Sequence, residues 1–163
     1  MNRVLVRQQI IHFLDKEIKG ILNDFDEKGL LENTIGFFLS DHGRPTLKGK
    51  YWMYDSGINV PFIIHAPQGM NLPKGFTPGK ENNQLLSSID IPATTLALAG
   101  VKKPQYMQGK VFLGEQSEPE REYIFASLDR IGGVHFKTRA VRSKKYKYIK
   151  NFNNGLSILE CST

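Results

Sequence analysis

The sequence is poor in cysteine and in long apolar runs, and both shortages limit what the protein can be. Cys161 is the single cysteine, so an internal disulfide framework and a cysteine-rich metal site are excluded. No apolar run approaches the roughly 18 residues of a membrane-spanning helix, so the sequence predicts no membrane span. Residues 1–7 hold three consecutive apolar residues before Arg7, too few for a secretory signal.

Acidic residues are missing from residues 131–159, and this absence coincides with a concentration of cations. The whole chain has a formal net charge of +6, which suits an anionic partner but bears on association and not on fold. Two interpretations stay open: a solvated positive face of a sheet, or a wall that attracts a polyanion. The cations are Lys137, Arg139, Arg142, Lys144, Lys145, Lys147 and Lys150.

Hydrophobic spacing predicts two helices. Apolar residues recur every three or four positions over Gln8–Leu31, which predicts an amphipathic helix that Gly29 stops. A second helix is predicted to open near Asp90, a candidate N-terminal cap, and to stop at Gly100.

Apolar runs and alternating segments predict the strands. Residues 34–39 and 60–66 fit strands that are apolar on both faces, as in a parallel sheet. Shorter alternating segments follow residue 122, and a tight turn at Lys144–Lys145 would join the last two. These segments, 123–126, 138–142 and 146–149, predict a small antiparallel sheet.

The first of these strands ends in Ser40-Asp41-His42-Gly43, which is the most informative stretch of the chain. An acid and an imidazole at the carboxyl end of a strand are placed where ligands gather in open α/β sheets. Gly43 lets the chain turn away, and residues 44–59 form a long loop rich in cations and aromatic rings. This pattern indicates a metal site; an ordinary aspartate in a turn is the alternative.

Short motifs that cover nearly the whole chain stand in one order: Asp26–Ile35, Ser40–Gly43, Gly49–Lys50, Tyr54–Gly57, Val60–Pro61, Ser88–Thr94, Leu98–Val101, Gln108–Lys110, Arg139–Arg142 and Tyr146–Ile149. In this order they resemble the C-terminal half of the sulfatase family, within the alkaline-phosphatase-like superfamily. The spacing from Asp41 to Lys50 is most similar to N-sulfoglucosamine sulfohydrolases and related polysaccharide sulfatases.

The resemblance implies roles for particular residues. Asp41 and His42 match the family's second pair of divalent-metal ligands, with calcium as the expected ion, and Lys50 matches the cation that bridges sulfate and leaving oxygen. Imidazole is a poor calcium ligand, so two alternatives follow. Either His42 bonds to the sulfate or the nucleophile instead of the metal, or the metal is softer than calcium. Weaker candidates for substrate contacts are Arg44, Asp129 and Arg130.

The chain departs from the family pattern at the nucleophile. Sulfatases take it from Cys-x-Pro-x-Arg or Ser-x-Pro-x-Arg, upstream of the Asp-His element, together with an Asp-Asp metal pair. Ser117–Arg121 fits the motif formally but lies downstream, so we interpret it as coincidence. The sequence therefore predicts the C-terminal portion of a sulfatase, which is inactive alone. Its expected partners are a sulfated carbohydrate substrate and either a missing N-terminal segment or a second copy of the chain. Nucleic acid is not an expected partner.

The predicted fold class is α/β: part of an alkaline-phosphatase-like mixed sheet with flanking helices over residues 1–114, and a small antiparallel β subdomain over 115–163. The predicted function is hydrolysis of a sulfuric ester or sulfamate. The resemblance implies that the complete enzyme is periplasmic, secreted or lysosomal. Two alternatives remain: a phosphate or phosphonate ester hydrolase of the same superfamily, and a non-catalytic polyanion-binding module.

Overall fold

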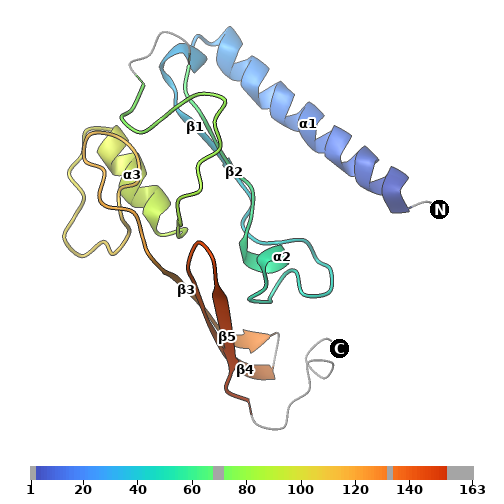
Figure 1. Ribbon diagram of the computed structural model, residues 1–163. Coiled ribbons are helices and arrows are strands. Elements are labelled where there is room, and N and C mark those ends of the chain that lie inside the picture. The colour runs from blue at the N-terminus through green and yellow to red at the C-terminus, as the bar shows by residue number, and fades with distance from the viewer. Residues whose placement is uncertain (1–2, 68–71, 132–133, 154–163) are drawn as a thin grey trace. The chain divides into compact units, whose positions relative to one another are not determined.

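A computed structural model of the chain describes residues 3–67, 72–131 and 134–153 (Figure 1). The chain divides into two compact units, Met1–Phe38 with Ile63–Asn71, and Leu39–Phe62 with Leu72–Thr163. Helices and strands both occur, as the α/β prediction required. In the described part of the chain, none of the helices has the length and apolar character needed to cross a membrane. The predicted domain boundary at residue 114 stays a prediction.

Helix α1, Arg3–Glu27, dominates the first unit and begins earlier than its predicted start. Its end is the predicted one, because Gly29 adopts a φ of +65°. The Gly29 N–H donates to the Asp26 carbonyl at 2.8 Å and the Leu30 N–H to the Phe25 carbonyl at 2.9 Å. These two bonds form a Schellman motif, in which glycine is the preferred residue.

The apolar stripe of α1 is exposed along most of its length. A stripe of this kind normally packs against a core, so its exposure leaves a surface that water disfavours. The exposed large apolar side chains are Ile10, Ile11, Phe13, Leu14, Ile21, Leu22 and Phe25.

Strands β1, Gly36–Leu39, and β2, Phe62–His65, form a two-stranded sheet after the short helix η1, Leu31–Asn33. A Cβ on Gly36 would lie 3.8 Å from that of His65. The Ser40 N–H donates to the Pro61 carbonyl at 3.3 Å.

These two contacts pair β1 and β2 in opposite directions, an arrangement that the predicted mixed sheet allows (Figure 1). An apolar run does not encode direction, since it indicates only burial. The expected burial on both faces is wrong here. In a sheet of two strands, Phe38, Leu39 and Ile63 remain exposed.

The second unit holds the predicted C-terminal sheet and two more helices. Helix α2, Asp55–Ile58, is a single turn inside the long loop, and α3, Asp90–Leu98, ends as predicted at Gly100 with a φ of +74°. Strands β3, Ile124–Ile131, and β4, Val134–Arg142, are antiparallel and continue the order β3-β4-β5.

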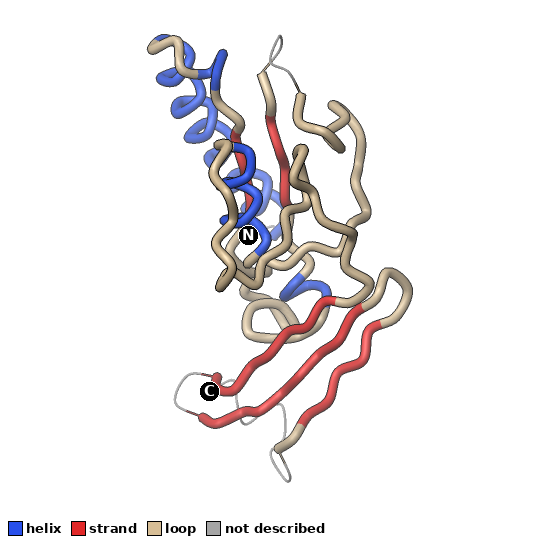
Figure 2. Tube along the Cα trace, turned by 90° about the vertical axis from the view of Figure 1, so that its left-hand side faces the viewer, coloured by secondary structure: helices blue, strands red, loops and turns tan. Residues whose placement is uncertain are grey.

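Strand β5, Lys147–Asn151, completes this sheet, whose three strands run side by side in Figure 2. The predicted turn between β4 and β5 is confirmed, since the Ser143 N–H donates to the Tyr146 carbonyl at 2.8 Å. One face packs around Phe136, which is 2% exposed, with Ile131 and Trp52 beside it.

Candidate active site

The loop between β1 and β2 is built by glycines whose missing side chains let backbone lie directly on backbone. The Gly43 N–H donates to the Gly57 carbonyl at 2.9 Å, which closes the loop on itself. A Cβ on Gly43 would lie 1.9 Å from the Ser56 carbonyl oxygen, and one on Gly49 would lie 2.0 Å from that of Arg44. This loop, residues 40–58, is hereafter the glycine loop, and its shape is accessible only to glycine at these positions.

Strain accompanies this close packing on both sides of Lys50. Lys48 and Tyr51 have positive φ values of 62° and 73°, which residues other than glycine rarely adopt. The Lys50 N–H donates to the Arg44 carbonyl at 2.8 Å, which fixes the backbone of Lys50 in the segment between Lys48 and Tyr51. Its ammonium nitrogen lies 5.3 Å from the centre of the Tyr51 ring. Strain of this kind gathers at functional sites.

The position of one ring hydrogen on His42 follows from the contact of the ring with the next residue. Its Nδ1 lies 2.8 Å from the Gly43 carbonyl oxygen. Because a carbonyl only accepts, Nδ1 carries a hydrogen, and in the neutral tautomer with that hydrogen the lone pair is on Nε2. This Nε2 lies 3.5 Å from Oδ2 of Asp41, whose side chain is 84% exposed. In that tautomer both atoms are acceptors, and a proton or metal ion between them would stabilise their approach.

The donor set fits part of a divalent-metal shell. Among the described residues, no three His, Cys, Asp or Glu side chains come together as a metal-binding group. Asp41 offers carboxylate oxygen and His42 offers Nε2, while hard cations take six or more ligands. The two residues supply at most part of such a shell, so their metal role stays a prediction.

The C-terminal sheet holds the glycine loop through Asp55. Arg142 donates to both carboxylate oxygens of Asp55, at 2.8 and 2.9 Å, and Lys147 also bonds to this carboxylate. The Lys147 ammonium reaches the Met53 carbonyl at 3.1 Å, and the Trp52 ring meets Phe136 edge-on at 5.7 Å. The hydrogen bond from Lys147 lowers the pKa of Asp55, which burial by itself would raise. Sequence reasoning missed Asp55, since its partners lie far along the chain.

The weaker substrate candidates make contacts within the protein. The Arg44 carbonyl accepts from the Lys50 N–H inside the glycine loop. Asp129 accepts from Arg139 at 2.5 Å. An Nη of Arg130 lies 3.4 Å from His135 Nε2. Their role toward a substrate stays a prediction.

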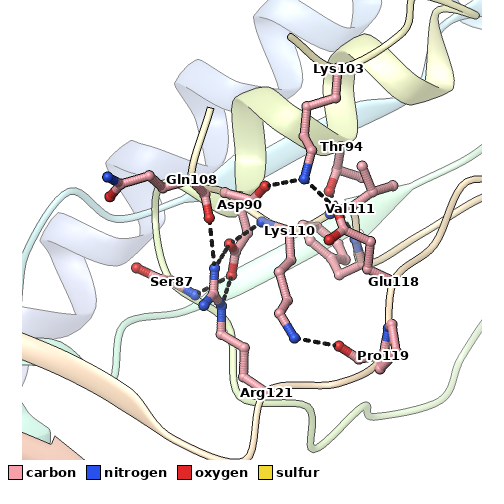
Figure 3. A network of polar contacts seen from close by, with 12 residues as sticks. Ser87, Asp90, Thr94, Lys103, Gln108, Lys110, Val111, Glu118, Pro119 and Arg121 are labelled. Carbon is pink, nitrogen blue, oxygen red and sulfur yellow. Dashed lines mark hydrogen bonds and ion pairs between the residues drawn. The ribbon is translucent and has the colours of Figure 1, made fainter. Parts of the chain in front are cut away.

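Asp90 anchors a second network that sequence reasoning misread (Figure 3). Its side chain is 1% exposed, and Arg121 binds it with two nitrogens, at 2.5 and 3.0 Å. The backbone N–H groups of Ser87 and Lys110 donate to it at 2.8 and 2.7 Å. The interpretation as an N-terminal cap is wrong, because Asp90 is the first residue of α3 and the capping position is Ile89, with no side-chain cap bond.

The pKa of Asp90 is lowered, although its burial opposes this, because Arg121 and the two amides stabilise the carboxylate. Arg121 is the last residue of the segment Ser117–Arg121, which resembles the nucleophile motif. Since its guanidinium is engaged with Asp90, and Glu118 with Lys103 at 2.5 Å, two of that segment's residues have structural contacts.

A substitution of Gly57 tests the packing of the glycine loop. A Cβ there would lie 2.2 Å from the Trp52 carbonyl oxygen and 2.3 Å from that of Gly49. Gly57→Ala should lower the free energy of unfolding by about 1–3 kcal/mol, the usual cost of overpacking. Urea denaturation measures this cost, and Gly20→Ala is the control, since its Cβ meets nothing within 4 Å and should stabilise α1. Equal stability of Gly57→Ala and wild type would contradict the packing.

An acid and an imidazole thus lie at the end of β1, and a lysine with a fixed backbone lies on the loop that follows. A family model described as Sulfatase matches residues 2–101. An ulvan-active sulfatase of Formosa agariphila is 40% identical over 139 residues, covering 85% of this chain and 22% of that protein. The chain belongs to the sulfatase family.

Two further comparisons agree with this assignment. The putative extracellular sulfatase Sulf-1 homolog of Caenorhabditis elegans is 34% identical over 160 residues, covering 90% of this chain and 22% of that protein. The solved structure of BT4656 in complex with its substrate D-glucosamine-2-N,6-O-disulfate matches with a TM-score of 0.67 and 25% identity. This match covers 88% of the chain and 30% of that structure, and it confirms the predicted fold class. The chain spans less than a third of each of these proteins.

Proposed function

We propose that this chain contributes metal-binding and sulfate-binding residues to the hydrolysis of a sulfate ester or sulfamate on a carbohydrate. The observation that supports it most directly is the approach of Asp41 Oδ2 to His42 Nε2, 3.5 Å apart, at the head of the loop that fixes Lys50. The family match favours a sulfate over a phosphate as the group that is cleaved from the substrate.

Each residue would have a distinct task. Asp41 would hold a divalent cation through its exposed carboxylate, and a bound cation would withdraw charge from the sulfate oxygens. His42 would ligate the same cation or accept a proton at Nε2, whose lone pair the Gly43 contact keeps available. Lys50 would stabilise the negative charge that develops on the leaving oxygen or nitrogen, because its ammonium is a compact cation.

The substrate class comes from the relatives. One is named for activity on ulvan, and another is described with a glucosamine that carries N- and O-sulfate groups. We therefore propose a sulfated carbohydrate as the substrate. We also propose that the complete enzyme works outside the cytoplasm, since one relative is named as extracellular.

A chimera tests this function. The matching segment of the Formosa agariphila sulfatase would be replaced by this chain, and release of sulfate from a sulfated saccharide would be measured. We expect turnover, and a loss of about 100-fold or more on Lys50→Ala, as for other groups that stabilise developing charge. Tyr106→Ala, on an exposed side chain, is the control. A folded, active chimera that is indifferent to both Asp41→Asn and Lys50→Ala would refute the assigned roles.

Calcium should bind the isolated chain weakly or not at all. Asp41 and His42 provide two ligands where calcium takes six to eight oxygens, so most of the shell is not supplied by these residues. Titration calorimetry measures the affinity, with Asp41→Asn as the control for any weak signal. Submicromolar binding would reveal further ligands in the chain.

Self-association is expected from the exposed stripe of α1. An apolar stripe on a helix of this length is hidden most simply against another copy of the same helix. Light scattering should show an oligomer at micromolar concentration. The double variant Leu14→Glu/Ile21→Glu should restore the monomer, whereas Lys16→Glu/Lys19→Glu should not. A wild-type monomer that binds no hydrophobic dye would contradict the expectation.

A further inference from the structure

The sheet β3-β4-β5 separates its residues onto two faces, and the face opposite the glycine loop has its own pattern. Phe125, Val141 and Tyr148 lie directly opposite one another on the three strands. Residues two positions along each strand, Ser127, Arg139 and Lys150, make the next row on the same face. A third row pairs Lys137 with Phe152, whose N–H donates to the Lys137 carbonyl at 2.9 Å. We name this surface the outer face.

The seven cations of residues 131–159 divide between these two faces and the turn that joins β4 to β5. Arg142 and Lys147 point to the inner face and bind Asp55, and Lys144 in the turn pairs with Glu120 at 2.7 Å. Lys145 lies in the same turn, with its ammonium nitrogen 5.2 Å from the centre of the Tyr146 ring. The outer face keeps three cations, Lys137, Arg139 and Lys150.

The outer face is positive with one carboxylate at its edge. Asp129 binds Arg139 at 2.5 Å. No described carboxylate pairs with Lys137 or Lys150, whose ammonium groups lie 5.6 and 4.9 Å from the centre of the Phe152 ring. The ring holds both cations in place while they remain exposed to solvent.

Two aromatic rings lie in the first row of the outer face, next to the rows that hold these cations. Phe125 is 77% exposed and Tyr148 is 63% exposed, although aromatic rings gain most from burial. With Val141 between them, their backbones stand about 10 Å apart, two strand spacings. Ring faces of this kind attract the C–H groups of sugar rings, because an aromatic face carries partial negative charge.

We propose that the outer face is a docking site for a linear sulfated polysaccharide, separate from the candidate active site. Phe125 and Tyr148 would stack on sugar rings, and Lys137 and Lys150 would pair with sulfate groups. Rings in the first row and unpaired cations in the next two rows match a polymer that alternates ring faces and anions. The choice of a sulfated carbohydrate over another polyanion rests on the proposed function.

Binding of fluorescein-labelled dextran sulfate to the full 163-residue chain tests this site by fluorescence anisotropy. We expect Phe125→Ala/Tyr148→Ala to raise the Kd about tenfold, which corresponds to about 1.4 kcal/mol of lost stacking. Lys137→Ala/Lys150→Ala should raise the Kd at least as much and reduce its salt dependence. Polyglutamate, which has charge without sugar rings, should bind more weakly, and its Kd should be the same for wild type and Phe125→Ala/Tyr148→Ala.

Matched variants separate this site from general charge and from catalysis. Lys16→Ala/Lys19→Ala removes two charges from α1 and should leave the Kd unchanged, as should Tyr106→Ala. Asp41→Asn should also leave it unchanged, so loss of the proposed catalytic role would not affect this result. Equal sensitivity to the Lys16/Lys19 variant, or polyglutamate binding as tight as dextran sulfate, would overturn the proposal. Tighter binding of single-stranded DNA would overturn it in favour of a nucleic-acid platform.

Discussion

The purified 163-residue chain is expected to release no sulfate from an aryl sulfate or a sulfated glucosamine, with or without added calcium. A sulfatase needs an attacking group, and the segment Ser117–Arg121, which resembles its motif, has Arg121 bound to Asp90. Asp41, His42 and Lys50 can bind and polarise a sulfate but cannot replace a nucleophile. Ion chromatography of released sulfate measures this, with background set by buffer alone.

The Ser117→Ala variant is the decisive control for this expectation. It should match wild type, because neither should exceed background. Clear turnover by wild type that disappears in Ser117→Ala would show that Ser117 attacks the substrate. That result would contradict both the predicted inactivity and the structural interpretation of the segment.

Asp90→Ala is expected to destabilise the chain by about 3–5 kcal/mol, the usual cost of leaving one partner of a buried ion pair behind. The variant strips Arg121 of its carboxylate and leaves the backbone N–H groups of Ser87 and Lys110 without their acceptor. Urea denaturation at neutral pH measures the loss. Asp24→Asn is the matched control, because its ion pair with Lys28 is exposed and should be worth at most about 1 kcal/mol.

The same ion pair sets a pH dependence. Because folding lowers the pKa of Asp90 from its ordinary 3.8, its contribution is complete above that value and is lost as the pH falls through the lower folded pKa. The stability of wild type should therefore fall more steeply in strong acid than that of Asp90→Ala. A variant within 1 kcal/mol of wild type at neutral pH, with a parallel acid profile, would show that the pair is dispensable.

Local patterns predicted the elements of this fold well. Gly29 and Gly100 stop their helices where the sequence indicated, since a left-handed cap depends on one residue and its immediate neighbours. The C-terminal strands and their turn at residues 143–146 also follow from alternation and turn chemistry. The family match likewise bears out the resemblance.

Long-range pairing was harder to predict. The sequence left the direction of β2 relative to β1 open, because hydrophobicity does not carry strand direction. Asp90 was read as a cap, since its partner Arg121 is distant in sequence and only the fold brings them together. Asp41, His42 and Lys50 were found because they are close along the chain, and their roles toward substrate remain predictions.

The attachment of the glycine loop to the C-terminal sheet has a consequence for the order of folding during synthesis. Asp55 lies 87 residues before Arg142, and Met53 lies 94 before Lys147. A ribosome therefore releases the loop well before the strands that hold it. The conformation that presents Lys50 cannot be locked until β4 and β5 have emerged and paired, because contacts this distant form late. Premature termination before residue 134 would leave the loop and its strained residues complete in sequence but without that attachment.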